Sequence, residues 1–102
     1  MLELRPNCEL CDADLPPESP DARICSYECT FCATCVEGVL RDVCPNCGGG
    51  FERRPIRPVD AWRPETGLAF DPPSTVRRTA KYSADDIAAL VERLADVDPA
   101  DR

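Results

Sequence analysis

The sequence predicts a small metal-stabilised α+β fold, in which a cysteine-rich module is followed by a proline-rich arm and a C-terminal amphipathic helix. Three observations lead to this fold class. All eight cysteines lie in the first half of the 102-residue chain, a helical pattern of apolar residues follows the third cysteine pair, and a longer helical pattern lies near the end. We expect the module over residues 1–51, the arm over 52–82 and the helix over 83–97.

The cysteines form four close pairs, separated along the chain by gaps of two, thirteen, three, two, two, eight and two residues. A two-residue gap suits a tight turn that aims both sulfurs at one ion, and two such pairs complete a tetrahedral four-thiolate site. The chain therefore carries the ligands for two metal sites, in the pairs Cys8/Cys11, Cys25/Cys29, Cys32/Cys35 and Cys44/Cys47.

Disulfides are the alternative use of eight cysteines. Disulfides persist in oxidising compartments, and residues 1–7 lack the basic region and apolar run of a signal peptide. We therefore expect a cytoplasmic protein with metal-bound thiolates. The chain also lacks an apolar run of about 18 residues, which argues against a membrane span.

Two metals come into question. The run Cys29-x2-Cys32-x2-Cys35 and the later Cys44-Pro45 partly match an iron–sulfur ligand pattern, but the last gap is eight residues instead of three. Tetrahedral thiolate sites otherwise suit zinc, so two Zn²⁺ ions are the expected cofactors. A stretch of about 40 residues rarely forms a sufficient hydrophobic core, so we expect the metal to hold the module together.

Local sequence indicates how the cysteines are presented. Apolar residues follow the third pair at helical spacing and predict a short helix: Val36, Val39, Leu40 and Val43. Gly38 lowers the intrinsic stability of this helix. The segment from Cys44 to Gly50 has the composition of a tight metal-binding turn, because Pro45 pre-sets φ and the glycines permit positive φ. Backbone N–H groups in such a turn can point at the thiolates.

The cysteine order resembles that of a RING finger, with Phe31 before the third pair, Leu10 inside the first, a helix after Cys35 and a closing C-P-x-C. Cys29 departs from the family, which most often has histidine at that position. The resemblance implies a cross-brace with a short hairpin and one short helix, in which the pairs alternate. Site 1 would then hold Cys8, Cys11, Cys32 and Cys35, and site 2 would hold Cys25, Cys29, Cys44 and Cys47.

The chain also resembles an uncharacterised bacterial family, a domain of unknown function found in short eight-cysteine proteins. The resemblance covers residues 1 to about 58 and rests on the opening Met1–Cys8 and on the stretch Ile24–Cys32. It implies no activity.

Two successive sites, over residues 8–29 and 32–47, are the alternative to alternation. The second stretch could close a zinc ribbon by itself. A helix starting at Cys35 favours alternation by analogy with cross-brace modules.

The composition argues against catalysis and against nucleic acid. Without histidine the chain lacks the commonest general base, and two complete four-cysteine sites leave no open coordination position. Asp85 and Asp86 are explained by the start of the terminal helix. Residues 1–50 carry nine acidic against three basic residues, a formal charge of −6, whereas nucleic-acid binders present clustered bases.

The arm is rich in proline and arginine and carries a formal charge of +3, between the acidic module and a terminal segment of −4. Such segments favour extended polyproline II conformations. The charges predict that the arm folds back onto the module rather than binding an external anion. Its apolar anchors either cover the module or present a short motif to a partner: Trp62, Leu68 and Phe70.

Ser83 and Asp86 predict the start of the terminal helix, which should end near Ala95 to Val97, before Asp98-Pro99. A helix of about 12 residues is marginal alone in water, so its apolar stripe should be buried. Either the module or a partner, including a second copy, would cover Ile87, Leu90, Val91 and Leu94.

These features together predict a non-catalytic zinc-binding module for protein interaction. One alternative is a ubiquitin-ligase-like adaptor for a conjugating enzyme, with Leu10, Val39 and Leu40 near the docking groove; Gly48 stands where active ligases often carry a basic residue. Another is zinc storage or delivery. The predicted partner-binding residues are Leu10, Val39, Leu40, Trp62, Ile87, Leu90, Val91 and Leu94.

Overall fold

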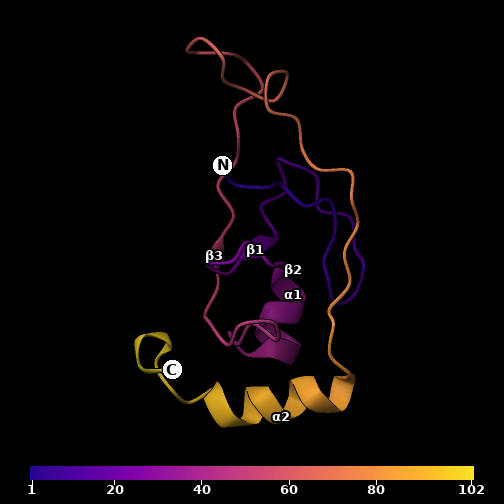
Figure 1. The fold of residues 1–102 in the computed structure, drawn as a ribbon, viewed down its shortest axis with the longest axis vertical. Helices are drawn as coiled ribbons and strands as arrows, with labels where there is room; N and C mark the ends of the chain where they lie inside the picture. The colour runs from indigo at the N-terminus through magenta and orange to yellow at the C-terminus, as the bar shows by residue number, and fades with distance from the viewer.

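A three-stranded antiparallel sheet lies near the middle of an elongated molecule of 45 × 26 × 18 Å (Figure 1). The computed structural model describes all 102 residues. Strands β1 (Ala22–Ile24), β2 (Thr30–Cys32) and β3 (Glu52–Arg53) lie in the order β2-β1-β3. With the two helical segments described below, they confirm the small α+β fold class that the sequence predicts.

Strands β1 and β2 form a hairpin whose turn carries the second cysteine pair. Ala22 pairs with Cys32 and Ile24 with Thr30, which brings Cys25 and Cys29 to the two ends of the turn. Cys25 N–H donates to Cys29 O at 3.2 Å, and Glu28 turns the chain with a positive φ of 68°. The short strands thus serve mainly to place cysteines.

The short helix predicted after the third pair is present, with a different geometry. Helix α1 (Ala33–Cys35) continues directly into η1 (Val36–Leu40), a wide π-helical turn. Val36 and Leu40 are buried, whereas Val39 is 54% exposed. The prediction placed Val39 on the apolar face by assuming about 3.6 residues per helical turn. It was wrong, because a π-helical turn contains more residues, so Val36 and Leu40 lie on the buried side and Val39 does not.

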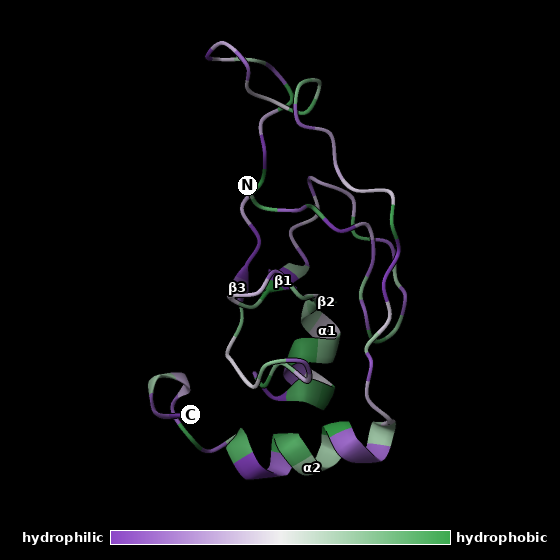
Figure 2. Cartoon of the chain, in the orientation of Figure 1, coloured by the Kyte–Doolittle hydropathy of each residue, from purple (hydrophilic) through white to green (hydrophobic).

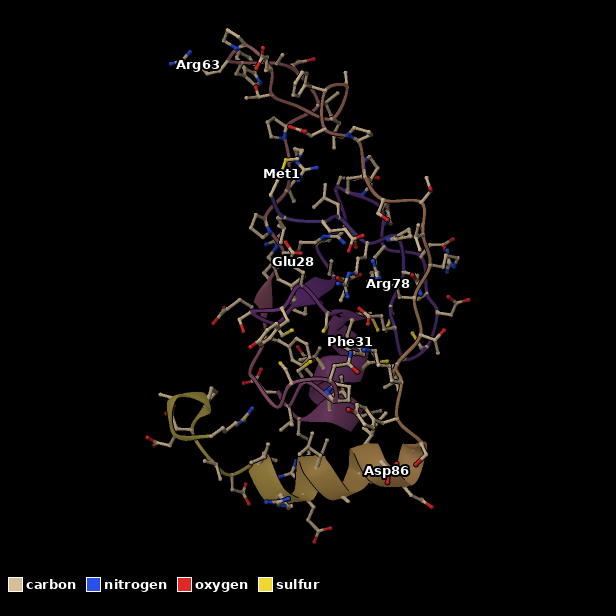
Figure 3. The ribbon with its side chains drawn as sticks, viewed as in Figure 1. Met1, Glu28, Phe31, Arg63, Arg78 and Asp86 are labelled. Carbon is tan, nitrogen blue, oxygen red and sulfur yellow. The ribbon has the colours of Figure 1, made fainter.

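The hydrophobic core surrounds the cysteines. Phe31, Leu40 and Val43 are fully buried, and the ring of Phe31 meets that of Phe51 edge to face, with centroids 5.4 Å apart. Figure 3 shows Phe31 among the side chains between the sheet and the helical segment. Six of the 14 residues in the buried cluster are cysteines, so the apolar core and the sulfur ligands are one structure.

The terminal helix α2 (Ala84–Leu94) lies across one end of the molecule (Figure 1). Its predicted start and end are confirmed: Ser83 Oγ accepts from Asp86 N–H at 3.1 Å, and Ala95 follows as the C-cap. Figure 2 shows apolar and polar residues alternating along this helix. Its apolar stripe packs against the core, with Ile87 and Val91 each 5% exposed and with Leu90 and Leu94 partly buried.

This packing corrects two predicted partner contacts. Ile87 and Val91 belong to the chain's own core cluster and offer almost no surface to a second protein. The C-terminal residues strengthen the attachment, since Arg102 Nη1 donates to the carbonyls of Asp42 and Gly48 at 2.8 and 3.1 Å. The helix is therefore part of the folded module.

The arm folds back along the N-terminal residues, the arrangement that its charge suggests. Ser74 N–H donates to Leu4 O, and Ala80 N–H donates to Glu9 O. Asn7, 1% exposed, exchanges two hydrogen bonds with the backbone of Arg78, donating to its carbonyl at 2.8 Å and accepting from its N–H at 3.1 Å. Basic arm residues also pair with acidic module residues in Arg77–Asp12, Arg77–Asp14 and Arg78–Glu3.

Between its two limbs the arm forms a projecting loop over residues 58–71, at the end of the molecule opposite α2 (Figure 1). Leu68 N–H donates to Pro58 O at 2.9 Å and closes the loop. Arg57 fixes its base by donating to Leu2 O and Asp71 O, at 2.7 and 2.8 Å. Trp62 and Phe70 are 73% and 57% exposed, so they do not cover the module.

The longest helix, α2, has 11 residues, and no helix in the structure combines the length and the apolar character needed to cross a bilayer.

A buried arginine joins the arm to the module. Arg54, 1% exposed, donates to the carbonyls of Arg5, Leu15 and Pro16 at 2.8, 3.1 and 3.0 Å. It has no carboxylate partner, and burial lowers the pKa of its guanidinium. The Arg54 side chain thus supplies the hydrogen bonds that a neighbouring strand would otherwise donate to the carbonyls of residues 5 and 15–16.

We expect Arg54→Ala to lower the free energy of unfolding by about 2–4 kcal/mol, because three buried carbonyls lose a charged donor. Chemical denaturation followed by circular dichroism would measure the change. The neighbouring Arg53 is exposed on β3, so Arg53→Ala should change the free energy by less than about 0.5 kcal/mol. Equal effects of the two substitutions would contradict this role.

Candidate metal centre

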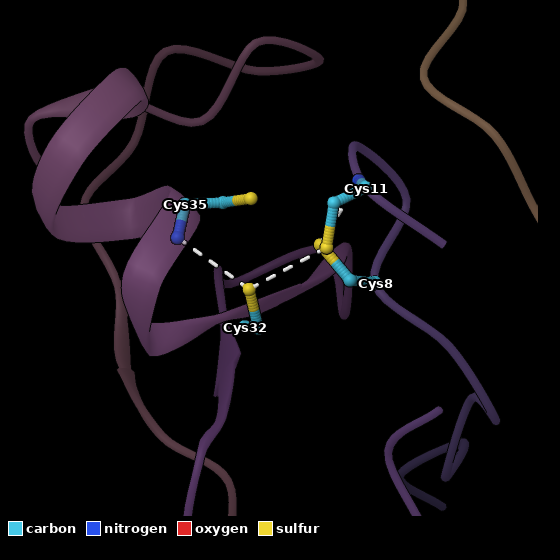
Figure 4. A group of neighbouring side chains, drawn as sticks. All are labelled: Cys8, Cys11, Cys32 and Cys35. Atoms are coloured by element: carbon cyan, nitrogen blue, oxygen red, sulfur yellow. Dashed lines mark hydrogen bonds between the residues drawn. The ribbon is translucent and has the colours of Figure 1, made fainter. Parts of the chain in front are cut away.

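Four cysteines from the first and third pairs gather into one cluster. The sulfurs of Cys8, Cys11, Cys32 and Cys35 all lie within 4.8 Å of one another (Figure 4). Cys11 Sγ and Cys32 Sγ are 3.7 Å apart. Four sulfurs held about 2.3 Å from a central ion in a tetrahedron would be about 3.8 Å apart, so this spacing fits a four-thiolate metal site.

The first cluster joins two separate parts of the chain. Cys8 and Cys11 lie on a turn near the N-terminus, whereas Cys32 ends β2 and Cys35 ends α1. In each pair a backbone N–H points at a sulfur: Cys11 N to Cys8 Sγ at 3.5 Å and Cys35 N to Cys32 Sγ at 3.4 Å. These donors would offset the negative charge of metal-bound thiolates.

A second cluster gathers cysteines from the second and fourth pairs. The sulfurs of Cys25, Cys44 and Cys47 lie within 4.8 Å of one another. Tyr27 N–H donates to Cys25 Sγ at 3.3 Å, and Gly49 N–H donates to Cys47 Sγ at 3.4 Å. The Gly49 contact is the backbone-to-thiolate arrangement expected for the glycine-rich turn.

The turns that carry the first and last pairs have the same hydrogen-bond pattern. Cys8 O accepts from Asp12 N–H and Cys8 N–H donates to Ala13 O; Cys44 O accepts from Gly48 N–H and Cys44 N–H donates to Gly49 O. The residue four positions after the first cysteine has positive φ in both turns, 64° at Asp12 and 80° at Gly48. Aspartate thus takes the place of glycine in the first turn, since Asp and Asn tolerate this conformation better than other residues.

The structure does not bring Cys29 into the second cluster. Its side chain is 7% exposed and lies next to Cys25, Glu9 and the Asn46 amide. Burial raises the pKa of Cys29, the hydrogen bond from Asn46 opposes that rise, and Cys25 and Glu9 add to it. The two clusters therefore contain four and three sulfurs, with Cys29 beside the smaller one.

The two clusters alternate along the chain, with the first pair joined to the third and the second to the fourth. Successive sites over residues 8–29 and 32–47 are therefore not the arrangement that the structure has. None of the eight cysteines forms a disulfide.

Three of the clustered cysteines are weaker acids than an ordinary thiol. Burial raises the pKa of Cys8, Cys35 and Cys44, and neighbouring cysteines raise the last two further. Cys11 has a lowered pKa, mainly because the backbone N–H of Ala13 donates to its sulfur. A cation must displace the protons of Cys8, Cys35 and Cys44 to bind there.

The sequence interpretation missed Glu9, which lies inside the first pair and links the two clusters. Its side chain is 4% exposed; it accepts hydrogen bonds from Thr30 N–H and from Arg5 Nη1, the latter at 3.1 Å. Its other oxygen lies 3.5 Å from Asn46 Nδ2, in the turn of the fourth pair. The sequence feature that could have indicated this role is the presence of a charged residue, Glu9, between the two cysteines of a C-x2-C turn.

The remaining predicted site residues are scattered. Leu10 is half-buried and packs against the core, Val39 is exposed, and Trp62 lies on the projecting loop. Leu40 is fully buried, so its predicted contact with a partner is corrected.

Comparison with known proteins assigns the N-terminal half of the chain. Residues 1–57 match a family described as protein of unknown function (DUF1272). An uncharacterised protein of Rhizobium meliloti (strain 1021) is 67% identical over 59 residues, which cover 58% of this chain and 70% of that protein. No solved structure matches the chain. The family match includes all eight cysteines and leaves α2 and most of the arm outside it.

We expect metal binding to release about four protons at the first cluster and about three at the second, with one more if Cys29 joins, because an ordinary thiol has a pKa of about 8.5 and must lose its proton to bind a metal. Calorimetry in buffers of different ionisation enthalpy would count these protons. Since binding displaces protons, metal should be lost as the pH falls. A release of two protons or fewer per ion would contradict thiolate ligation.

Paired substitutions should separate the clusters. Cys8→Ser/Cys32→Ser should remove one ion, and Cys25→Ser/Cys44→Ser should remove the other, since each pair lies in a single cluster. Native mass spectrometry would report about one ion per chain in each case. The crossed variant Cys8→Ser/Cys25→Ser damages both clusters and should retain less metal. Retention of one full ion by the crossed variant would contradict the grouping.

Proposed function

The chain belongs to the DUF1272 family of proteins of unknown function, and we propose that it is a non-catalytic zinc-binding module that presents the exposed aromatic side chains of its projecting loop, which lies outside the family match, to a protein partner. The observation that carries this proposal is the exposure of Trp62 and Phe70 on a loop whose base is fixed by hydrogen bonds.

Zinc is the proposed metal because all the clustered donors are thiolates. Zinc accepts a tetrahedral all-cysteine set and needs no redox partner, and its binding can contribute roughly 10–16 kcal/mol to the folding of a small domain. We propose two Zn²⁺ ions, one per cluster, with Cys29 as the fourth ligand of the second. The metal would then have a structural role.

A cross-brace like that of RING fingers is the proposed architecture of the module. Three features support it: the alternate grouping of the pairs, the hairpin that carries Cys25 and Cys29, and the helical segment that follows Cys32. The related role of adaptor for a conjugating enzyme has less support, because Leu40 has no exposed surface and α2 packs against the same helical segment.

The non-catalytic assignment rests on the available side chains. The chain has no histidine, and its cysteines are gathered for metal binding. The carboxylate of Glu9, the most buried acid, is occupied by Arg5 and Thr30. These residues leave no nucleophile with an adjacent base.

The projecting loop suits recognition for two reasons. Exposed aromatic side chains contribute large apolar contact area at little entropic cost, and tryptophan is enriched at the centres of protein interfaces. The loop is also ordered before binding, because Arg57 and the Leu68–Pro58 hydrogen bond fix its base. A preformed loop loses less entropy when a partner binds.

We expect Trp62→Ala and Phe70→Ala each to weaken partner binding at least about tenfold, as buried aromatic contacts do when truncated. Protein from the native host would be captured on the metal-loaded chain, identified, purified and titrated against each variant. Trp62 is the only tryptophan, so its fluorescence should shift to shorter wavelength as the partner covers it.

Tyr27→Ala is the matched control, since Tyr27 is as exposed as Trp62, at 72%, but lies on the module hairpin. It should leave binding unchanged. A captured protein that binds the two loop variants as tightly as the unsubstituted chain would overturn the proposal.

A further inference from the structure

The two cysteine clusters differ in completeness. In the first, four sulfurs are already within tetrahedral reach of one another; in the second only Cys25, Cys44 and Cys47 are. Cys29 lies beside the second cluster and lines the same hollows as the Asn46 side chain. The fourth position of the second cluster therefore depends on a cysteine that stands apart from the other three.

Two open hollows meet at Cys29. One, of about 340 Å³, is lined by the basic side chains of Arg5, Arg78 and Lys81 and by the carboxylate of Glu9; the other, of about 440 Å³, is bounded by Tyr27, Cys47 and Lys81. Cys29, Asn46 and Lys81 line both. A small molecule entering from either side reaches the fourth position. Cys11 of the first cluster is exposed at the surface, but no hollow of the molecule borders any cysteine of that cluster.

Polar groups around Cys29 can accommodate its movement. The Asn46 side-chain oxygen is buried without a hydrogen-bond partner, so this pocket already holds one unpaired acceptor. A released Cys29 thiol offers a weak donor there. The basic side chains of Arg78 and Lys81 are both exposed and line the first hollow. Arg78 is paired with Glu3 at 3.2 Å, so Lys81 is the basic group that favours an incoming anion.

We propose that Cys29 is the exchangeable ligand of the second site, and that this site transfers its metal to anionic thiols. In the step, an incoming thiol binds the ion through its sulfur and gives up its proton. The bond between the ion and Cys29 breaks, and Cys29 takes one proton, so no electrons are transferred. The ion is then held by Cys25, Cys44, Cys47 and the incoming sulfur, and further exchanges of the same kind remove it.

This inference goes beyond the interaction role but rests on the proposed metal binding. The first site, complete and without a bordering hollow, would remain loaded and keep the module folded. The second would exchange. Metal delivery and loop recognition would therefore use different parts of a stable scaffold.

The experiment begins with the full chain shown by native mass spectrometry to hold two zinc ions, which tests the metal binding separately. Mercaptosuccinate is then added, and released zinc is measured with the chromogenic chelator pyridylazoresorcinol. We expect one ion to leave at least tenfold faster than the other. Neutral mercaptoethanol should act more slowly than mercaptosuccinate, and cationic cysteamine more slowly still. A two-ion protein that releases both ions in a single phase, or shows no dependence on thiol charge, overturns the proposal.

Two matched pairs of variants assign the fast ion. Cys29→Ser should keep both ions but speed loss of the fast one, whereas Cys11→Ser should alter only the slow one. Lys81→Gln should reduce the advantage of mercaptosuccinate several-fold, while Arg63→Gln, at the tip of the projecting loop (Figure 3), should not. Complete loss of one ion in Cys29→Ser, as expected for Cys44→Ser, would show that Cys29 is a fixed ligand and overturn the proposal.

Discussion

The convergence of cysteines from distant parts of the chain is the constraint on which the rest of the fold depends. The strands have only two or three residues each, and the helical segment between β2 and β3 has eight, so the cysteine-rich half of the chain has too little regular structure to define a fold by itself. Cysteines supply six of the 14 core residues, including the fully buried Cys8 and Cys44. If each cluster holds a metal ion, as its geometry allows, the same sulfur atoms would provide both the crosslinks and the centre of the apolar packing.

Around this centre, polar contacts extend the fold into segments that have no regular structure. Arg54 and Asn7 are buried, and each satisfies several backbone groups that a strand would otherwise pair. Such groups would be costly if left unpaired, which explains why a proline-rich arm can lie ordered against the module. The surface ion pairs of Arg77 and Arg78 help to position the arm on the module but contribute little to the free energy of unfolding.

The sequence reveals those features that repeat or follow a simple period. Pair spacing indicated the cysteine clusters, and the Ser83 cap with its apolar stripe indicated α2. Val39 was misplaced because nothing in its neighbours signals a π turn. The partner of the α2 stripe was undetermined, since an amphipathic pattern does not specify what covers it. Arg54 could not be recognised as buried because its acceptors lie about 40 to 50 residues away. The separation of Cys29 from the other three sulfurs is a matter of side-chain placement, which the spacing of the cysteines does not specify.

The returning limb of the arm and the helix α2 attach to the module by different interactions, and salt should change the strength of these two attachments in opposite directions. The ion pairs of Arg77 with Asp12 and Asp14 are exposed, so they weaken as the screening length shortens. The contact of α2 through Ile87 and Val91 is apolar and is strengthened by strongly hydrated anions such as sulfate. At high concentrations of such salts the returning limb of the arm should therefore detach from the module more easily, while α2 should bind to it more strongly. Ionic strength would therefore loosen the chain around Arg77, while the hydrogen bonds of Arg57 and Leu68 keep the base of the projecting loop in place.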